Sequence, residues 1–535
     1  MRSSRIGMAM ISWLLLFVIA ATAGAGGTTE PTESVLRVGF EYDLSIIDPV
    51  FTTAHSARNH GYMVYDTLFG VDNQLNPLPQ MVSNWEVSSD SLTYTFNLRD
   101  GLKFHDGSPV TSDDVIASML RWSKVDSLGK MLFDHVDVAV AVDEDTFELR
   151  LKEPFGSVID ALAKPDSNVL FIMPERVAST PHDEQIEDPI GSGPFIMVQD
   201  EYVPGSKIVY VKFEDYVPRD EPPIGTAGGK VAKVDRVEMS IMPDFGTAAS
   251  ALIAGEIDYV LWPPVDMAEL FESAENVELR ASNQLGSQGY IRFNHLLPPF
   301  DNKLARQAVY WAIDQKEYLA TIFGDSEFVR ESYSIYGADT LYASDAGTEA
   351  LKGYDLERAR ALVQQSGYDG RPVVLLDPVG TSPHHEATLV TAANLRKIGF
   401  EVEIQAMDLS TMMQRRAIQK PVDEGGWNIF HTGFGLMSVT NPLTSPAIQA
   451  GEEVGCARQG WPGWPCYPAL GEKISEFGSA TSDEERMRIA AEIQAMALNH
   501  GTHAYYGQYL KLLAFRSELD GVLEAPVPVF WNISK

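Results

Sequence analysis

The chain has 535 residues, of which 45% are hydrophobic and 10% aromatic, a composition typical of folded proteins. Its formal net charge of −33 at pH 7 repels phosphate backbones and argues against nucleic acid as a partner. The charge does not identify a ligand, because an acidic surface suited to a salty habitat has the same composition. The chain is too long for one hydrophobic core, so at least two lobes are expected.

The first 25 residues have the features of a secretory signal peptide. Arg2 and Arg5 form a basic start, residues 8–21 are almost entirely apolar, and small residues of the A-x-A type follow at 21–25. The apolar run is shorter than the ~20 residues of a membrane span, so an uncleaved anchor is the weaker alternative. We expect cleavage of 1–25 and a soluble periplasmic protein, without a lipid anchor because no cysteine lies near the cleavage site.

The first half combines strands with one clearly capped helix. Residues 35–40 predict a buried strand, residues 92–98 alternate apolar and polar side chains as in a half-buried strand, and 147–151 predict another strand. Thr111 and Asp114 predict the start of a helix, because a hydroxyl and a carboxylate three residues apart satisfy free backbone N–H groups.

The second half has a clearer α/β pattern. A strand at 372–376, a helix at 386–397 and a strand at 400–406 form a β-α-β order that favours parallel pairing. Two further helices are predicted at 355–367 and 482–501, each opened by a side-chain cap and closed at a glycine.

The chain has two cysteines, Cys456 and Cys466. In an oxidising compartment such a pair is more often a disulfide than a metal or redox site. We therefore predict a disulfide between them.

No pattern of catalytic residues is present. His384-His385-Glu386 begins like a zinc-protease helix, but Leu389 stands where the second histidine is needed, so a polar loop before the helix is the better interpretation. The serine in 191–195 is not spaced as a nucleophile elbow, and a tight turn is expected there. We expect no enzymatic activity, no cofactor and no bound metal.

Longer motifs extend over nearly the whole chain. They are FHDGSPVTSDDV at 104–115, GSGPF at 191–195, AGEID at 254–258, FN and PFDN at 293–294 and 299–302, and RQAVYWAID at 306–314. In this order they resemble the bacterial extracellular solute-binding family that serves ATP-driven importers of dipeptides, oligopeptides and nickel.

The resemblance implies an α/β, two-lobed periplasmic-binding-protein fold with a hinge and an extra inserted subdomain in the first lobe. Lobe I is expected to comprise 36–65, 190–285 and 501–535, with the inserted subdomain at 66–189, and lobe II 286–500. A solute would be enclosed between the lobes, where pockets usually form, and closure would change the surface that the permease recognises.

Candidate ligand contacts follow from the resemblance and from side-chain chemistry. Thr52, Thr53 and His55 follow the first strand and offer hydroxyl and imidazole groups; a plain polar hinge loop is the alternative. Arg415 and Arg416 offer a planar fork for a carboxylate; the alternative is that they are solvated helix residues.

Further candidates are aromatic or amide side chains. Trp427, His431 and Phe434 could enclose an apolar part of a ligand, although each is more often a core residue, and Asn441 and Gln508 complete the set.

One departure from the family concerns the ligand amine. Peptide-binding relatives commonly carry an aspartate near a Trp…Asp-Pro stretch, whereas residues 434–442 contain Ser438, Thr440 and Asn441 but no acid. This puts a peptide with a free amino terminus in doubt and leaves room for a carboxylate, an opine-like or a sugar-like solute.

The predicted function is a monomeric periplasmic receptor that delivers a peptide-like solute to the membrane permease of an ABC importer. One alternative is a receptor for nickel or a metal chelate, motivated by His55, His60 and His431. Another is a receptor for a non-peptide solute, and the third is a secreted hydrolase built on a binding scaffold.

Overall fold

A computed structural model of the protein describes residues 33–40, 43–379 and 383–535. The predicted signal peptide, 1–25, lies outside the described residues. Among the helices of these three ranges, none combines the length and apolar character that a membrane crossing requires. The compact unit that carries the architecture is 34–535.

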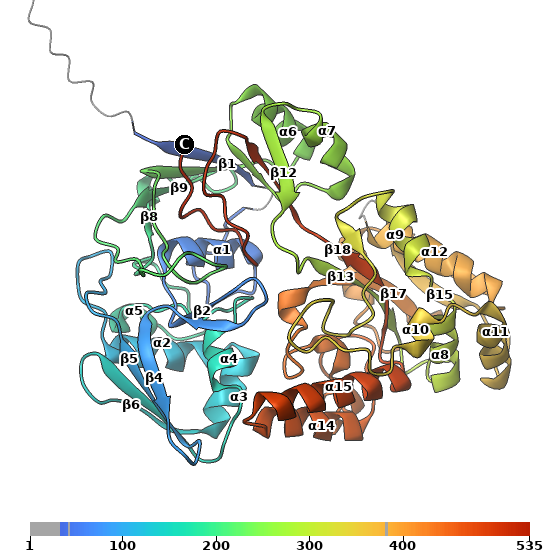
Figure 1. The fold of residues 1–535 in the computed structure, drawn as a ribbon. Helices are drawn as coiled ribbons and strands as arrows, with labels where there is room; N and C mark the ends of the chain where they lie inside the picture. Colours follow the sequence, from blue (N-terminus) through green and yellow to red (C-terminus); the bar gives the residue numbers. More distant parts are fainter. Residues whose placement is uncertain (1–32, 41–42, 380–382) are drawn as a thin grey trace, which may run out of the picture. The chain divides into compact units, whose positions relative to one another are not determined.

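The first half is organised on a seven-stranded sheet of order β12-β19-β11-β1-β10-β9-β8 (Figure 1). Its strands are β1 (Val35–Phe40), β8 (Phe195–Met197), β9 (Lys207–Lys212), β10 (Arg236–Ile241), β11 (Tyr259–Leu261), β12 (Val277–Ala281) and β19 (Leu512–Arg516). The accompanying helices are α1 (His55–Val64), α6 (Phe245–Ala254) and α7 (Ala268–Glu272). Strand β1 is parallel to β10 and β11, and its bounds match the predicted strand.

The second half is organised on a six-stranded sheet of order β14-β18-β13-β17-β15-β16. Its strands are β13 (Ser287–Phe293), β14 (Val329–Arg330), β15 (Val373–Pro378), β16 (Val402–Met407), β17 (Ile429–Gly435) and β18 (Ala504–Tyr509). Its helices are α8 (Lys303–Trp311), α9 (Gln315–Phe323), α10 (Glu349–Lys352), α11 (Leu356–Gln365), α12 (His384–Lys397), α13 (Leu409–Arg415), α14 (Pro468–Ser479) and α15 (Asp483–His500). Strand β15 is parallel to β16, as the β-α-β pattern predicted, and it is also parallel to β17.

A third sheet, of order β4-β5-β7-β6, lies within the segment predicted as an inserted subdomain. Its strands are β4 (Val82–Val87), β5 (Thr93–Leu98), β6 (Val136–Ala141) and β7 (Thr146–Leu151), and a small hairpin joins β2 (Phe69–Val71) to β3 (Pro77–Pro79). The helices of this segment are α2 (Ser112–Trp122), α3 (Ser127–His135), α4 (Val158–Ala163) and α5 (Glu175–Ala178). Strand β5 alternates buried and half-buried residues, and Thr111 and Asp114 form the predicted capping box.

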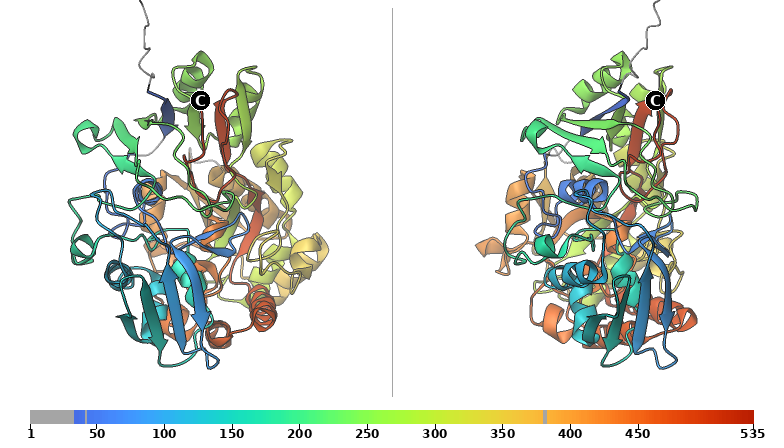
Figure 2. Two further views of the ribbon diagram at one scale, coloured as in Figure 1. Left: turned by 60° about the vertical axis from the view of Figure 1, so that its left-hand side comes forward. Right: turned by 90° about the vertical axis from the view of Figure 1, so that its left-hand side faces the viewer.

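The chain passes twice between the seven-stranded and six-stranded sheets, and the two crossings run together (Figures 1 and 2). One joins β12 to β13 and the other joins β18 to β19. The backbone N–H of Ser282 donates to the carbonyl of Lys511 at 2.8 Å. Residues 501–535 were predicted to belong to lobe I, but β18, which lies in this range, pairs with β13 of the six-stranded sheet. The crossing from β18 to β19 therefore follows Tyr509. The lobe boundaries themselves stay a prediction.

Two local expectations have clear outcomes. Cys456 and Cys466 form the predicted disulfide, with Cα atoms 4.4 Å apart. The polar loop expected at His384 and His385 is wrong, because α12 begins at His384. The sequence gives no signal for this helix start, because Pro383 at the N-cap position has no side chain that can cap the helix.

Candidate functional site

The carboxyl ends of parallel strands in both sheets locate the candidate site. Strands β1, β10 and β11 are parallel to one another in the first half, and β15, β16 and β17 in the second. In open α/β sheets ligands bind outside the carboxyl ends of the strands. A ligand is therefore expected near the segments that follow these ends, such as 262–264 after β11 and 436–442 after β17.

A loop at 164–168 holds the segment that leads into α1. The Asn168 amide nitrogen lies within hydrogen-bond distance of the carbonyls of Pro49, Val50 and Thr52, at 3.3, 2.9 and 3.1 Å. The Ser167 hydroxyl donates to the carbonyl of Thr53 at 3.2 Å. The 164–168 loop and the 52–55 segment therefore form one structure.

Asp166 links this structure to the end of β17. Its carboxylate accepts from Arg58 of α1 at 3.3 Å and from the Ser438 hydroxyl, and it lies 4.0 Å from His55. Burial alone would raise the pKa of Asp166, but Arg58 and the Ser438 hydroxyl hold it below its usual value. An ionised carboxylate thus joins the two halves.

Lys511, on the second crossing, is close enough to Asp166 for the two charges to interact. Its ammonium nitrogen is 4.0 Å from the ring centroid of Trp262, which directly follows β11, and His55 meets the same indole edge-on with ring centroids 6.4 Å apart. Burial and the neighbouring Arg58 lower the pKa of Lys511 to about 8. Partial burial, Arg58 and Lys511 lower the pKa of His55 to about 4, so this imidazole is neutral at pH 7.

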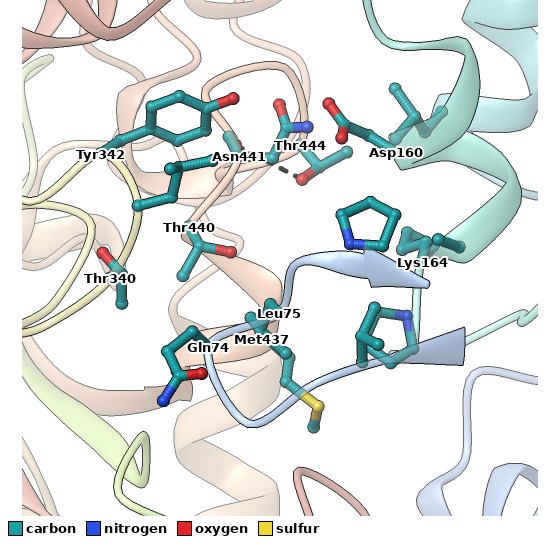
Figure 3. Close-up of a pocket in the computed structure, with 16 residues that line it drawn as sticks. Gln74, Leu75, Asp160, Lys164, Thr340, Tyr342, Met437, Thr440, Asn441 and Thr444 are labelled. Atoms are coloured by element: carbon teal, nitrogen blue, oxygen red, sulfur yellow. Dashed lines mark hydrogen bonds between the residues drawn. The ribbon is translucent and has the colours of Figure 1, made fainter. Parts of the chain in front are cut away.

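A small pocket of about 80 Å³ is lined in part by the start of the 164–168 loop (Figure 3). One wall comprises the β2-β3 hairpin and the end of α4, with Gln74, Leu75, Asp160 and Lys164. The opposite wall belongs to the second half and includes Thr340, Tyr342, Met437, Thr440, Asn441 and Thr444. Because one wall comes from each half, the pocket exists only when they are in contact.

Close contacts beyond this pocket keep the halves together. The backbone N–H of Gly156 donates to the carbonyl of Gly478 at 3.0 Å, and a Cβ atom at Gly156 would lie 1.7 Å from the carbonyl oxygen of Ala480. Arg486 of α15 pairs with Asp160 of α4. Glycine is therefore required at 156 for this approach.

Comparisons with known proteins identify the family of this chain. Residues 76–450 match the model of the bacterial extracellular solute-binding proteins, family 5, middle region. One relative is y4tO of Sinorhizobium fredii, described as a probable peptide ABC transporter periplasmic-binding protein. The two sequences are 37% identical, and the match covers 95% of this chain and 94% of the relative. The chain belongs to the family-5 solute-binding proteins. This is a family of solute-binding proteins and not of enzymes.

Two solved structures of two-lobed periplasmic binding proteins share the fold of this family-5 chain. DppA from Helicobacter pylori, in complex with the peptide STSA, superposes with a TM-score of 0.73 at 21% identity, covering 94% of this chain and 98% of that one. AgaA from A. tumefacien R10, in complex with agropinic acid, gives the same TM-score at 23% identity, covering 94% and 98%.

Four of the predicted contact residues of this family-5 protein lie at or near the junction of the halves. Thr52, Thr53 and His55 contact the 164–168 loop, and 46% of the His55 side chain is exposed. Asn441 lines the pocket, where its amide oxygen accepts from the backbone N–H of Leu443 at 2.9 Å. A role in ligand binding for these four stays a prediction.

The structure places Arg415, Arg416 and Trp427 away from the junction. Arg415 donates to the carbonyls of Gly425 and Gly426, just before the amino end of β17, and so points away from the carboxyl edge. The guanidinium of Arg416 lies 5.5 Å from the ring centroid of Phe430. Trp427 is fully buried and donates to the carbonyl of Arg416 at 3.0 Å.

His431, Phe434 and Gln508 are engaged within the second half. Both ring nitrogens of His431 lie within 3 Å of hydroxyls, at 2.9 Å from Thr388 and 2.7 Å from Thr391. Phe434 packs edge-on against Tyr290 and Trp461. The buried amide of Gln508 donates to the carbonyl of Leu285 and accepts from the N–H of Ala338. Direct ligand contact by these side chains stays a prediction, and it would compete with this packing and these bonds.

The three histidines that motivated a metal-chelate receptor lie in separate surroundings. His60 is buried with its Nδ1 atom 2.9 Å from the Tyr210 hydroxyl, His431 is enclosed by α12 hydroxyls, and His55 lies beside Trp262. Within the described ranges, no group of three or more His, Cys, Asp or Glu side chains is arranged to hold a metal ion.

Sequence reasoning missed Asp166, Trp262 and Lys511. Lys511 is the one charged residue in the otherwise uncharged run 504–515, and Trp262 directly follows the short apolar strand β11 and precedes Pro263. Both positions are signals that could have been read. Asp166 has no such signal, because its role in joining the halves depends on a hydrogen bond with Ser438, which is 272 residues further along the chain.

Proposed function

We propose that this protein is a periplasmic receptor that captures a peptide or peptide-like solute and delivers it to the membrane permease of an ABC importer. The observation that carries the proposal is the meeting of both halves at Asp166, where Arg58 from one half and Ser438 from the other bind the same carboxylate. A site built from two halves responds to a ligand by closing, since closure both buries the ligand and creates a new outer surface.

The relatives support a peptide-like ligand. The Sinorhizobium fredii protein is described as a probable peptide transporter component, and the Helicobacter pylori protein binds the peptide STSA. The absence of an acid in 434–442 is compensated in part, because Asp166 from the inserted segment lies against Ser438. Its two protein partners leave it less available to a ligand amine, so we favour ligands held mainly through their other groups.

The experiment is a binding screen on the exported, mature protein. Native mass spectrometry of the protein as purified identifies any retained solute, and a thermal-shift screen then compares STSA, other di- to pentapeptides and agropinic acid. A bound solute or a concentration-dependent rise in Tm for a panel member is the expected result. No retained solute, together with no rise for any member of the panel, would contradict the proposal.

The proposal also includes a monomeric receptor with a cleaved leader at 1–25. Lobe I would comprise 36–65, 190–285 and 501–535, with the inserted subdomain at 66–189, and lobe II would comprise 286–500. Mass spectrometry of the periplasmic protein reports the mature amino terminus, and light scattering reports the oligomeric state. A mature chain retained in the cytosol would contradict a periplasmic receptor.

A further inference from the structure

We propose that Lys511 is the anchor for a carboxylate of the ligand, which docks beside Trp262 at the junction of the two halves. The inference rests on the proposed receptor function and adds the chemical class of the group that the site recognises. Four observations carry it: the charge balance, the free donors of the ammonium group, the conformation of Trp262 and the place of Lys511 on the crossing.

The charges around Lys511 are not balanced. The groups that act on it are Arg58, a cation, and Asp166, a carboxylate. Asp166 already accepts from Arg58 and Ser438, and the nearby Lys164 is paired with Asp126. Among the described residues, one positive charge at the junction therefore has no carboxylate of its own, and a monoanionic ligand group would neutralise it.

The ammonium group of Lys511 has donors to spare. An ammonium carries three N–H donors, and in the described part of the chain this one forms no ion pair and donates no hydrogen bond to a carbonyl. Its neighbour is the face of Trp262, 4.0 Å away, which attracts a cation but accepts no conventional hydrogen bond. A carboxylate can bind the remaining donors while the indole covers one side.

Trp262 is held in this position by an unusual backbone conformation. Its φ of 52° is rare for a bulky side chain, and its N–H donates to the carbonyl of Leu512 at 3.0 Å. Uncommon conformations of this kind persist where the surroundings enforce them, often at ligand sites. The same indole also meets His55, whose side chain is 46% exposed, so solvent reaches this side of the cluster.

The place of Lys511 in the fold suits a ligand that stabilises closure. Its carbonyl accepts from Ser282 of the other crossing, so its backbone lies on the two segments that connect the halves. A carboxylate bound here would touch groups of the first half, at Trp262 and His55, while it binds the crossing itself. A ligand anchored here favours the closed state through the contacts that the rest of the ligand makes with the second half.

The test compares one probe in two chemical forms. Calorimetry measures the binding of STSA with a free carboxylate and of STSA with an amidated carboxyl end, to the wild-type protein, Lys511→Met, Lys511→Arg and the control Lys316→Met. Lys316 is 76% exposed on the second half, so its removal changes the net charge equally without touching the junction.

Loss of one charge-assisted hydrogen bond weakens binding by about 10- to 100-fold. We expect this loss of affinity when the wild-type protein binds amidated STSA and when Lys511→Met binds STSA with a free carboxylate. Lys511→Met should bind amidated STSA with little further loss. Lys511→Arg retains the preference for the acid, and Lys316→Met behaves as the wild type.

The outcomes separate the two levels of the account. Equal affinity for acid and amide, or full affinity in Lys511→Met, would overturn the carboxylate anchor and leave the receptor function standing. A wild-type protein that binds neither form of STSA, nor agropinic acid, nor acetate and glutarate at millimolar concentration, contradicts the anchor and the peptide-receptor function together.

Discussion

Two lysines of this protein lie over tryptophan rings, but they differ in whether a carboxylate of the protein binds the ammonium group. The lysine with such a partner is a structural ion, and the one without it is available to a ligand. Lys230 is fully buried, 5.0 Å from the ring centroid of Trp531, and its ammonium binds the Asp66 carboxylate at 2.7 Å. Lys511 is partly buried, 4.0 Å from the ring centroid of Trp262, and among the described residues no carboxylate binds it.

The comparison shows what each environment requires. Asp66 accepts from Lys230 and from the Tyr216 hydroxyl; burial raises its pKa, but Lys230, the Tyr216 hydroxyl and the backbone N–H of Thr67 together hold it below its usual value. That pair is complete inside one half of the molecule and needs no ligand. Lys511 is incomplete until a partner arrives, so the two lysines should differ in stability and in binding.

The largest effect is expected from Lys230→Met. Removal of one partner leaves the Asp66 carboxylate buried and unpaired, which costs about 3–5 kcal/mol of unfolding free energy. Urea unfolding followed by circular dichroism measures it. The double variant Lys230→Met/Asp66→Asn should recover part of the loss, because no uncompensated charge is left. A Lys230→Met protein as stable as the wild type would remove the distinction between the two lysines.

The next effect concerns closure, on which the Lys511 site depends and the Lys230 pair does not. Gly156→Ala places a Cβ atom against the carbonyl of Ala480, so the closed contact cannot form and affinity for a ligand should fall by about tenfold or more. Small-angle scattering with ligand should show a larger radius of gyration than for the wild type.

Gly246→Ala is the matched control for this substitution. A Cβ atom there meets the Asp244 carboxylate at an ordinary 3.4 Å, so binding and closure should be unchanged. A Gly156→Ala protein that binds and compacts like the wild type would show that the contact plays no part in closure.

The pH dependence of binding sharpens the comparison further. Only the ammonium form of Lys511 attracts a carboxylate, and its pKa of about 8 means that above pH 8 the free protein must take up a proton to bind. Affinity should therefore be flat from pH 6 to 7.5 and then fall by up to about tenfold per pH unit.

The charged neighbours do not alter this sign. A guanidinium keeps its proton in proteins, so Arg58 stays charged, while the lowered pKa values of Asp166 and His55 keep the first ionised and the second neutral over this range. In Lys511→Arg the fall should move beyond pH 10, because guanidinium keeps its proton. Constant affinity of the wild type between pH 7 and 9.5 would contradict the prediction.

The smallest effect is on the stability of the ligand-free protein. Because the pKa of Lys511 is lowered in the folded state, its charge opposes folding below about pH 8, and this cost disappears as the pH rises toward the usual lysine value. Lys511→Met should therefore raise the unfolding free energy at pH 7 by about 1 kcal/mol, the opposite sign to Lys230→Met. A loss of stability would show that Lys511 is a structural ion.

Local patterns in the sequence predicted the scaffold better than the site. Strand β1, the capping box at Thr111 and Asp114, the β15-α12-β16 unit and the disulfide depend on neighbours in the chain or on a simple pairing. These physical causes are visible in the sequence.

The site depends on contacts that no local pattern contains. Arg415 and Trp427 carry suitable chemistry, but α13 and the core of the second half direct them away from the carboxyl edge. Asp166 and Lys511 become neighbours only after the chain has folded around both sheets. The lone charge of Lys511 in an uncharged run and the place of Trp262 directly after an apolar strand were the signals available in advance.

The most direct test is a crystal structure of the wild-type protein with a bound carboxylate ligand such as STSA. The account predicts a ligand enclosed between the halves, with a carboxylate oxygen within about 3 Å of the Lys511 ammonium nitrogen and with Trp262 against it. A ligand held elsewhere, with Lys511 in contact only with Trp262 and solvent, would contradict the account.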